Sequence, residues 1–160
     1  MESKVVWNGK MAFSGSAESG FSLPLDADLS VGGEAQGFRP MELLAIGLAG
    51  CTAMDVIAIL TKKRQVISAF DVQVHTERAE THPKVFTSAV IEYHVYGQSV
   101  DEAAVLRAIE LSTTAYCPAQ AMLGQIMPIE LKYYIFEEAL DGQRSLVKSG
   151  AFHQPQKAQI

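Results

Sequence analysis

One long hydrophobic segment lies near the middle of the chain. Pro40 opens it, and proline suits the first turn of a helix because the backbone N–H that it lacks would be unpaired there. Residues 43–60 are then apolar or small, except for Thr52 and Asp55. A helix that is hydrophobic almost all round is buried on most of its sides. The pattern therefore predicts a long, buried central helix around which the rest of the chain is arranged.

A segment of this length also reaches the lower limit for a membrane span, about 17 residues. Thr52, Asp55 and two interior glycines oppose that alternative. An unpaired carboxylate near the bilayer centre costs about 2.5–3.5 kcal/mol on insertion. The sequence also has no second segment of comparable length and hydrophobicity. We therefore expect the central helix of a soluble domain, and no membrane partner.

Short segments with the composition of β-strands lie on both sides of this helix. Before it, Asn8-Gly9 supplies the positive φ angles of a two-residue hairpin turn. Pro24 argues for an edge strand, because proline cannot donate a hydrogen bond to a sheet. After the helix, His82-Pro83 marks a turn between two alternating segments. The expected strands are residues 5–7, 11–13, 21–25, 70–75, 87–97 and 129–135.

A second helix should begin near Ser99, because Ser99 and Glu102 form the Ser-x-x-Glu signature of a capping box. It should stop before Pro118, since the residue in front of a proline avoids the helical conformation. Pro118 can then open a short third helix, which leaves Cys117 at or near its N-cap. The dipole at the start of a helix favours a thiolate in that position.

The expected order is three strands, a helix, two strands, two helices and a last strand. Strands grouped around one hydrophobic helix indicate an α+β fold rather than an alternating one. With 160 residues, of which 48% are hydrophobic, the chain can bury its own core. We expect a single domain over residues 1–138. Residues 139–160 lack clear periodicity, and we expect them to form a C-terminal extension that is mobile or loosely docked.

The formal net charge of −5 argues against a nucleic-acid partner, because nucleic acids are bound through basic surfaces. The N-terminus lacks the apolar region of a signal peptide, so we expect a cytoplasmic location in which the cysteines are reduced. Two cysteines are too few for a closed structural zinc site, and the histidines have no clear further ligand. We expect neither a metal nor another cofactor.

The two cysteines fall in distinctive positions, Cys51 within the apolar helix and Cys117 before a proline. A peroxide-reducing dithiol needs one cysteine as a thiolate to attack the O–O bond, and a second to convert the resulting sulfenic acid into a disulfide. The alternative is that both are small apolar filling residues, since free cysteine is among the most buried residue types. The residues alone leave both interpretations open.

Two segments resemble the cysteine-containing helices of the OsmC/Ohr family of thiol-dependent peroxidases, namely PMELLAIGLAGCTAMDV and YCPAQAML. The segment between them, HTERAETHPKVFTSAVIEYHVYG, is similar to the branch of that family close to the bacterial YhfA-like proteins. The resemblance implies an OsmC-like fold, in which N-terminal β-hairpins and a curved antiparallel sheet pack on the central helix. It also implies an intertwined homodimer with two active sites at the interface.

In that family the first cysteine attacks a hydroperoxide, preferably an organic one, and the second cysteine resolves it. The resemblance carries these roles over to Cys51 and Cys117 respectively. A dithiol reductant would regenerate the thiols, and the function would be hydroperoxide reduction in oxidative-stress defence. The alternatives are a non-catalytic dimer that binds an apolar ligand, and a redox sensor that forms the same disulfide without turnover. A Cys51 thiolate at neutral pH would favour the enzyme.

The sequence departs from the family pattern at two positions. The well-studied peroxidases have an arginine in the first hairpin, which holds the reactive thiolate, and a glutamate directly after the proline, which orients that arginine. Here the hairpin offers only Lys10, Met41 follows the proline, and Glu42 comes one position later, about 100° round the helix. Lysine is not equivalent to arginine, because it lacks the planar guanidinium fork.

Other charged residues could compensate for these departures. We expect Arg39 or Arg78 to supply positive charge to Cys51. The alternatives are a solvated surface charge for Arg39 and a strand-end ion pair for Arg78. Asp55, one helical turn beyond Cys51, could orient an arginine in place of the family glutamate. Unpaired, Asp55 would disfavour the thiolate, and a purely structural hydrogen bond is the alternative.

Overall fold

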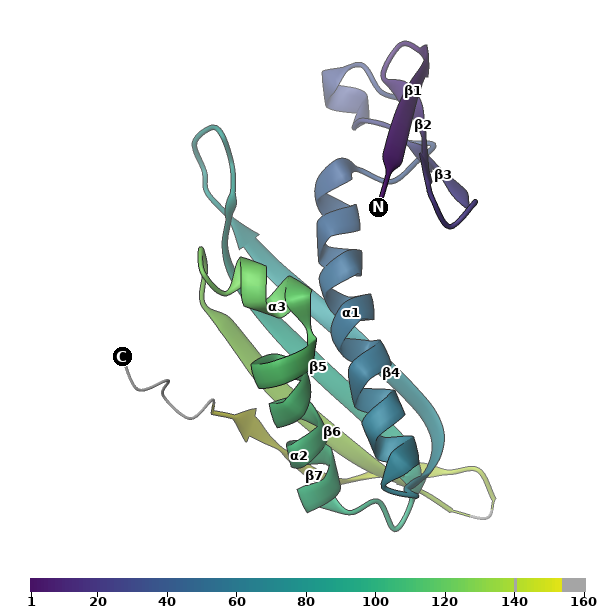
Figure 1. Cartoon of the computed structure of the whole chain (residues 1–160), viewed down its shortest axis with the longest axis vertical. Helices are drawn as coiled ribbons and strands as arrows, with labels where there is room; N and C mark the ends of the chain where they lie inside the picture. The colour runs from purple at the N-terminus through teal and green to yellow at the C-terminus, as the bar shows by residue number, and fades with distance from the viewer. Residues whose placement is uncertain (140, 154–160) are drawn as a thin grey trace. The chain divides into compact units, whose positions relative to one another are not determined.

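The computed structural model describes residues 1–139 and 141–153, and Figure 1 shows the course of the chain. The contacts within the chain divide it into two compact units, Met1–Ile46 and Gly47–Ile160. The long helix α1 (Pro40–Lys62) begins in the first unit and continues into the second. The expectation of a single domain over residues 1–138 stays a prediction.

The first unit is built on a three-stranded antiparallel sheet in the order β1-β2-β3. Its strands are β1 (Ser3–Gly9), β2 (Ala12–Ala17) and β3 (Ser22–Leu25). Pro24 lies in an edge strand, as predicted. The first hairpin turn is Lys10-Met11 rather than Asn8-Gly9, because Gly9 pairs with Ala12 and closes the ladder. Positive φ angles accordingly occur at Gly9 and Lys10.

The second unit combines a four-stranded sheet with helices, and it contains most of the elements that the sequence predicts. A π-helical segment, absent from the prediction, joins the second helix to Cys117. The remaining elements are β4 (Val66–Arg78), β5 (Phe86–Gln98), α2 (Glu102–Leu111), the π-helical segment (Ser112–Tyr116), α3 (Pro118–Leu123), β6 (Ile129–Glu138) and β7 (Arg144–Phe152).

The sheet of the second unit has the order β4-β5-β6-β7, and β5 and β6 run parallel. The expected sheet was antiparallel throughout, so this part of the prediction is wrong. The connection from β5 to β6 consists of α2, the π-helical segment and α3. It is long enough for β6 to begin at the same end of the sheet as β5, as a parallel pair requires. Figure 1 shows these helices and α1 on the same side of the sheet.

The core of the second unit lies between that face of the sheet and the helices. Successive side chains of a strand point to opposite faces, so every second residue of β5 is buried here. Fully burying one leucine or isoleucine side chain stabilises the fold by about 1.5–3 kcal/mol. The buried apolar residues of the central elements are Leu48, Val56, Leu60, Ala89, Ile91, Tyr93, Val95, Ala104, Val105, Ala108, Ile109, Leu131, Tyr133 and Ile135.

Helix α1 is covered on one stripe only. Its buried residues follow one another at intervals of four: Leu48, Thr52, Val56 and Leu60. Met54, on another side of the same helix, is 73% exposed. The prediction of a helix buried on most sides is therefore wrong for a single chain, because one sheet face can cover only one stripe. By length and composition α1 would also suit a membrane span, a test that core helices of soluble proteins pass as well.

Helix α2 begins two residues later than the proposed capping box. Asp101 is the N-cap, and its carboxylate accepts a hydrogen bond from the N–H of Ala103 at 3.0 Å. Ser99 has a φ of 51°, and its N–H donates to the carboxylate of Glu137. The Ser-x-x-Glu prediction is wrong because an aspartate closer to the helix provides the stronger acceptor.

Most of the described C-terminal extension is a strand. β7 pairs antiparallel with β6 along its length, so the expectation of a mobile or loosely docked segment is wrong for Arg144–Phe152. The hydroxyl of Tyr133 in β6 donates to Glu102 at 2.7 Å, and Lys148 in β7 forms an ion pair with the same carboxylate at 3.5 Å. Residues 140 and 154–160 lie outside the described part of the chain.

Replacing Gly150 with valine should destabilise the protein by about 1–3 kcal/mol. A Cβ atom at Gly150 would lie 2.8 Å from the Tyr133 hydroxyl oxygen and 3.0 Å from its ring. Chemical denaturation monitored by circular dichroism measures the free energy of unfolding. Ser149→Ala, at the exposed neighbouring position, is the control and should change little. Equal stability of Gly150→Val and the wild type would contradict this packing of β7 on Tyr133.

Candidate functional site

The two cysteines, far apart in the sequence, meet in the second unit. Cys51 lies in α1 and is partly buried, whereas Cys117 is 3% exposed. The Cys51 side chain lies close enough to Cys117 to raise the pKa of its thiol, and both thiols are free. An attacking and a resolving cysteine must come within reach of one another before a disulfide can form. The structure therefore brings together the pair on which two-cysteine chemistry depends.

The chain around Cys117 folds tightly because a proline follows it. Cys117 leaves the helical region, with φ −77° and ψ 102°, and becomes the N-cap of α3 as the sequence predicts. Its backbone N–H donates to the carbonyl of Ser112 at 2.8 Å. Its sulfur accepts a hydrogen bond from the backbone N–H of Gln120 at 3.4 Å. Single π-helical turns of this kind occur mostly at functional sites.

The expected thiolate at Cys117 is not favoured. Burial, and after it the neighbouring Cys51 side chain, raise the pKa of the Cys117 thiol to about 12. The N–H groups of Gln120 and Ala119 lower this pKa, but by less. The helix-dipole argument fails because desolvation of a buried charge outweighs the N–H groups of a six-residue helix. Cys117 is thus a protonated thiol at neutral pH.

Four polar side chains meet beside the two cysteines, and all four are at least 95% buried. The hydroxyl of Thr52 lies at the centre. It is 2.7 Å from the Tyr93 hydroxyl, 2.9 Å from the Ser112 hydroxyl and 2.9 Å from the Gln120 side-chain nitrogen. The Ser112 hydroxyl also donates to Asp55 at 3.0 Å. We call Thr52, Tyr93, Ser112 and Gln120 the polar cluster.

The Asp55 carboxylate fixes the direction of every hydrogen bond in the cluster. An ionised carboxylate only accepts, so Ser112 must donate to it and accept from Thr52. Thr52 then has no proton left for Tyr93, and it accepts from both Tyr93 and the Gln120 amide. Burial raises the pKa of Tyr93 to about 12, which keeps its donating proton in place. Each hydroxyl of the cluster therefore has a partner for its proton.

The sequence predicts Asp55 as a site residue but misses the polar cluster. Asp55 lies one turn from Cys51, and its bond to Ser112 matches the structural alternative. Among residues 1–139 and 141–153, Asp55 forms no ion pair with a lysine or arginine. A signal for the cluster was available, since Thr52 is a polar residue within an apolar helix and directly follows Cys51.

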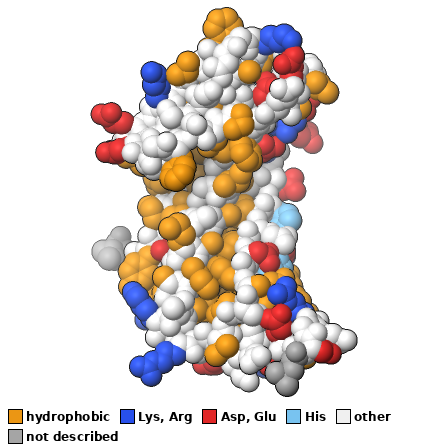
Figure 2. Space-filling model, turned by 90° about the vertical axis from the view of Figure 1, so that its right-hand side faces the viewer, with side chains coloured by type: hydrophobic (Ala, Val, Ile, Leu, Met, Phe, Trp, Pro, Cys, Tyr) orange, Lys and Arg blue, Asp and Glu red, His pale blue; other side chains and the backbone are white. Residues whose placement is uncertain are grey.

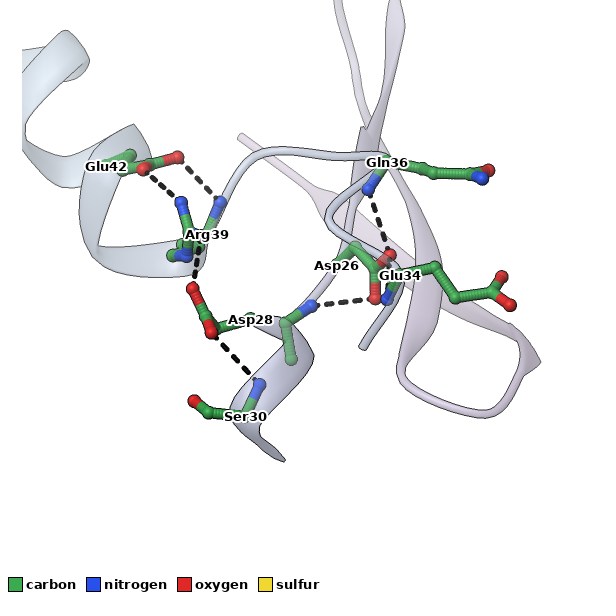
Figure 3. Close-up of polar contacts among 8 residues, drawn as sticks. Asp26, Asp28, Ser30, Glu34, Gln36, Arg39 and Glu42 are labelled. Atoms are coloured by element: carbon green, nitrogen blue, oxygen red, sulfur yellow. Dashed lines mark hydrogen bonds and ion pairs between the residues drawn. The ribbon is translucent and has the colours of Figure 1, made fainter. Parts of the chain in front are cut away.

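Arg39 and Glu42 contact one another at the start of α1, in the first unit (Figure 3). The Arg39 guanidinium lies 2.9 Å from Glu42 and 2.7 Å from Asp28. Glu42 also accepts the backbone N–H of Arg39 at 2.9 Å, the main reason why its pKa is lowered. The start of α1 therefore contains an arginine–glutamate ion pair, which was not evident from the sequence. Arg39 is exposed, as in the alternative of a solvated surface charge, and it also forms two ion pairs.

The loop in front of α1 is held by a buried carboxylate that the sequence did not single out. Asp26 is 5% exposed and accepts the backbone N–H groups of Ala27, Glu34 and Gln36 at 2.8 to 3.1 Å. These bonds, with that of Gln36 first, lower the pKa of Asp26. Figure 3 shows how they draw the loop around the carboxylate. Lys10, in the turn of the first hairpin, pairs with Glu34.

Arg78 lies at the end of β4 and donates to the backbone carbonyl of Lys84 at 2.9 Å. This bond spans the β4–β5 turn and replaces the ion pair with a glutamate that we considered. Its part in activating Cys51, like that of Arg39 and Glu42, stays a prediction. Within the described residues, no three histidine, cysteine or acidic side chains are placed to hold a metal ion.

A cavity of about 710 Å³ opens beside Cys117, between the segment that carries this residue and the ends of β6 and β7. Tyr116, Pro118 and Met127 contribute to its lining on one side. Phe152 and His153, from the C-terminal extension, contribute on another. The volume falls in the range of small-molecule sites. Cys117 therefore borders a space large enough for a small molecule.

Both cysteines and the polar cluster lie in a segment that matches a known protein family. The family model described as OsmC-like protein matches residues 33–132, which include both cysteines and the polar cluster. The chain belongs to the OsmC family. Protein YhfA of Escherichia coli K12 is 33% identical over 135 residues, covering 84% of this chain and 98% of YhfA. The predicted family is thereby confirmed.

Solved structures agree with this assignment to the OsmC family. A crystal structure of a hypothetical protein from Aquifex aeolicus superposes with a TM-score of 0.75 at 28% identity, covering 86% of this chain and 97% of that one. An organic hydroperoxide resistance protein OsmC from Legionella pneumophila superposes with a TM-score of 0.60 at 16% identity, covering 84% and 94%. The second likeness shows a shared fold. The α+β, OsmC-like fold class is thus confirmed.

Alkylation should distinguish the two thiols of this OsmC-family protein. Between about pH 7 and 9, iodoacetamide should modify Cys51 much faster than Cys117, because only the thiolate reacts and burial holds the Cys117 pKa near 12. Mass spectrometry of proteolytic peptides reports each site separately. In denaturant the two rates should become similar. Equal rates in the folded protein would show that Cys117 is neither shielded nor held as a thiol.

Proposed function

We propose that this protein reduces organic hydroperoxides with Cys51 as the attacking and Cys117 as the resolving cysteine. The observation that supports the proposal is the proximity of the two cysteines, since Cys51 is near enough to raise the pKa of the Cys117 thiol while both thiols are free. The partly buried Cys51 is the more accessible of the pair. The relatives named as hydroperoxide resistance proteins share this fold and lend further support.

The proposed oxidation of the two cysteines by a hydroperoxide takes place in two steps. The Cys51 thiolate attacks the terminal oxygen of the hydroperoxide, the O–O bond breaks, and the alkoxide takes a proton and leaves as an alcohol. Cys51 is now a sulfenic acid, oxidised by two electrons. The sulfur of Cys117 then attacks the sulfur of Cys51, a disulfide forms, and water leaves with the thiol proton of Cys117. A dithiol reductant restores both thiols by exchange, as in a reducing cytoplasm.

The raised pKa of Cys117 separates this residue from the attacking role, and Cys117 must give up its proton when it resolves the sulfenic acid. A protonated thiol does not compete with Cys51 for the hydroperoxide, because the thiolate is the nucleophile. A buried cysteine pair is also what a non-catalytic binding module of this fold would contain. The reaction with hydroperoxide decides between the two functions.

A thiol count on the reduced protein tests the proposal. One equivalent of an organic hydroperoxide should remove both thiols of the wild type, because the sulfenic acid closes to a disulfide. Cys51→Ser should retain its remaining thiol, whereas Cys117→Ser should lose its thiol to a sulfenic acid that a 1,3-diketone can trap. Survival of both thiols in the wild type would end the peroxidase proposal and favour the binding module.

The same assay tests the proposed cation. We expect Arg39→Ala or Arg78→Ala to slow oxidation of Cys51 by about tenfold, the effect of losing one charge that stabilises a thiolate. Substituting Lys62, another cation that is exposed, provides the matched control. If both arginine variants react at the wild-type rate, neither arginine activates Cys51.

We also propose that the protein acts as a homodimer in which a second copy covers α1. Although the helix is apolar almost all round, its buried residues form a single stripe. Exposed apolar side chains on other sides of the helix include Ile46 and Met54. Figure 2 shows hydrophobic side chains gathered over the middle of one face. Large exposed apolar patches on soluble proteins commonly mark interaction surfaces.

Met54→Glu should weaken this dimer, because it would bury a charge at the proposed interface. Sedimentation velocity should find the wild type as a dimer and Met54→Glu shifted toward the monomer. Val147→Glu, at an exposed apolar position in β7, is the matched control and should remain dimeric. A monomeric wild type, or an equal shift in both variants, would be inconsistent with an interface centred on α1.

A further inference from the structure

We propose that Thr52 is a positioning residue, whose hydroxyl holds Cys117 within bonding reach of Cys51. The proposal rests on the two-cysteine function proposed above and assigns a role to a residue next to the attacking cysteine. Thr52 is fully buried and faces the sheet and α2, whereas Cys51 precedes it by one position on α1. The two side chains therefore point in directions about 100° apart round the helix.

The hydroxyl of Thr52 binds the chain on both sides of Cys117. Ser112, five residues before Cys117, accepts its proton at 2.9 Å. Gln120, three residues after Cys117, donates its side-chain N–H to the same oxygen at 2.9 Å. One atom of α1 thus fixes both ends of the segment that carries Cys117.

Cys117 is in turn tied to the same two residues. Its backbone N–H donates to the Ser112 carbonyl at 2.8 Å, and its sulfur accepts the backbone N–H of Gln120 at 3.4 Å. The position of the Cys117 sulfur therefore depends on Ser112 and Gln120, and their positions depend on Thr52. These hydrogen bonds among Thr52, Ser112 and Gln120 enclose Cys117, and we call them the clamp.

Two further bonds keep the clamp in one arrangement. Asp55, one turn along α1, accepts from Ser112 and so gives the hydroxyls a single direction. Tyr93 in β5 donates to Thr52 and fastens the clamp to the sheet. Thr52 thus makes three hydrogen bonds, the most that a hydroxyl can make with one proton and two lone pairs. A valine at this position would remove all three bonds and leave the buried Tyr93 proton without its 2.7 Å acceptor, whereas Ser112 would keep its bond to Asp55.

The disulfide equilibrium tests this role without relying on peroxide chemistry. Full-length protein is equilibrated with mixtures of reduced and oxidised glutathione, which exchange two thiols for one disulfide and release two molecules of reduced glutathione. Mass spectrometry then measures the fraction with a Cys51–Cys117 disulfide. For Thr52→Val we expect the equilibrium constant for disulfide formation to fall by about tenfold or more, because the cysteines are no longer held together. Thr52→Ser, which keeps the hydroxyl, should stay within about twofold of the wild type.

A matched control separates positioning from loss of stability. Val56→Ala removes buried volume one turn further along the same stripe of α1, and the apolar Val56 side chain makes no hydrogen bond within the polar cluster. It should lower the free energy of unfolding, yet leave the disulfide equilibrium near the wild-type value. Ser112→Ala, which breaks one arm of the clamp, should shift the equilibrium in the same direction as Thr52→Val.

Three outcomes would overturn the proposal. They are an unchanged equilibrium in Thr52→Val, an equal shift in Val56→Ala, and a wild type that forms no Cys51–Cys117 disulfide in oxidised glutathione. A separate arm adds hydroperoxide together with a 1,3-diketone trap. Thr52→Val should oxidise Cys51 at the wild-type rate and accumulate the trapped sulfenic acid. If glutathione gives the expected shifts while hydroperoxide leaves both thiols intact, the positioning role stands and the peroxidase proposal fails.

Discussion

The hydrogen bonds of one buried hydroxyl, that of Thr52, connect the parts of the second unit that matter for chemistry. They reach β5 through Tyr93, the end of α2 through Ser112, and α3 through Gln120. Buried polar groups of this kind are costly unless each is satisfied, and here each hydroxyl is. The cysteine-bearing segment therefore has little freedom to shift along α1, and the distance between the thiols is set by polar contacts rather than by apolar packing alone.

The sequence predicts the elements of the fold well, because hydrophobic periodicity and proline positions act locally. Helix α1, the strands on either side of it and the N-cap position of Cys117 follow from such signals. The direction of β6 does not, since a parallel or antiparallel pairing depends on where the crossover connection ends. β7 was missed because Arg144–Phe152 is mostly exposed and lacks the alternation that a strand with one buried face shows.

The sequence predicts some residues of the candidate site and misses others, and the reason is physical. Cysteines and charged residues can be singled out in a sequence, so Cys51, Cys117 and Asp55, which lie beside the polar cluster, were among the predicted residues. Thr52, Tyr93, Ser112 and Gln120 are common residue types, and their role arises only from their meeting in space. The thiolate expected at Cys117 was a local inference from the helix start. Burial, which depends on the whole unit, reverses it.

Strand β7 also determines which backbone groups at one edge of the sheet could pair with other chains. Without it, the backbone groups of β6 along one side would be unpaired and could template the pairing of a foreign strand. With it, the outermost strand on that side carries Arg144 and Lys148, which form ion pairs with Glu138 and Glu102 of the protein's own fold. Charged side chains on an edge strand discourage edge-to-edge association. β7 thus gives the sheet a charged edge at the side where the cavity beside Cys117 opens.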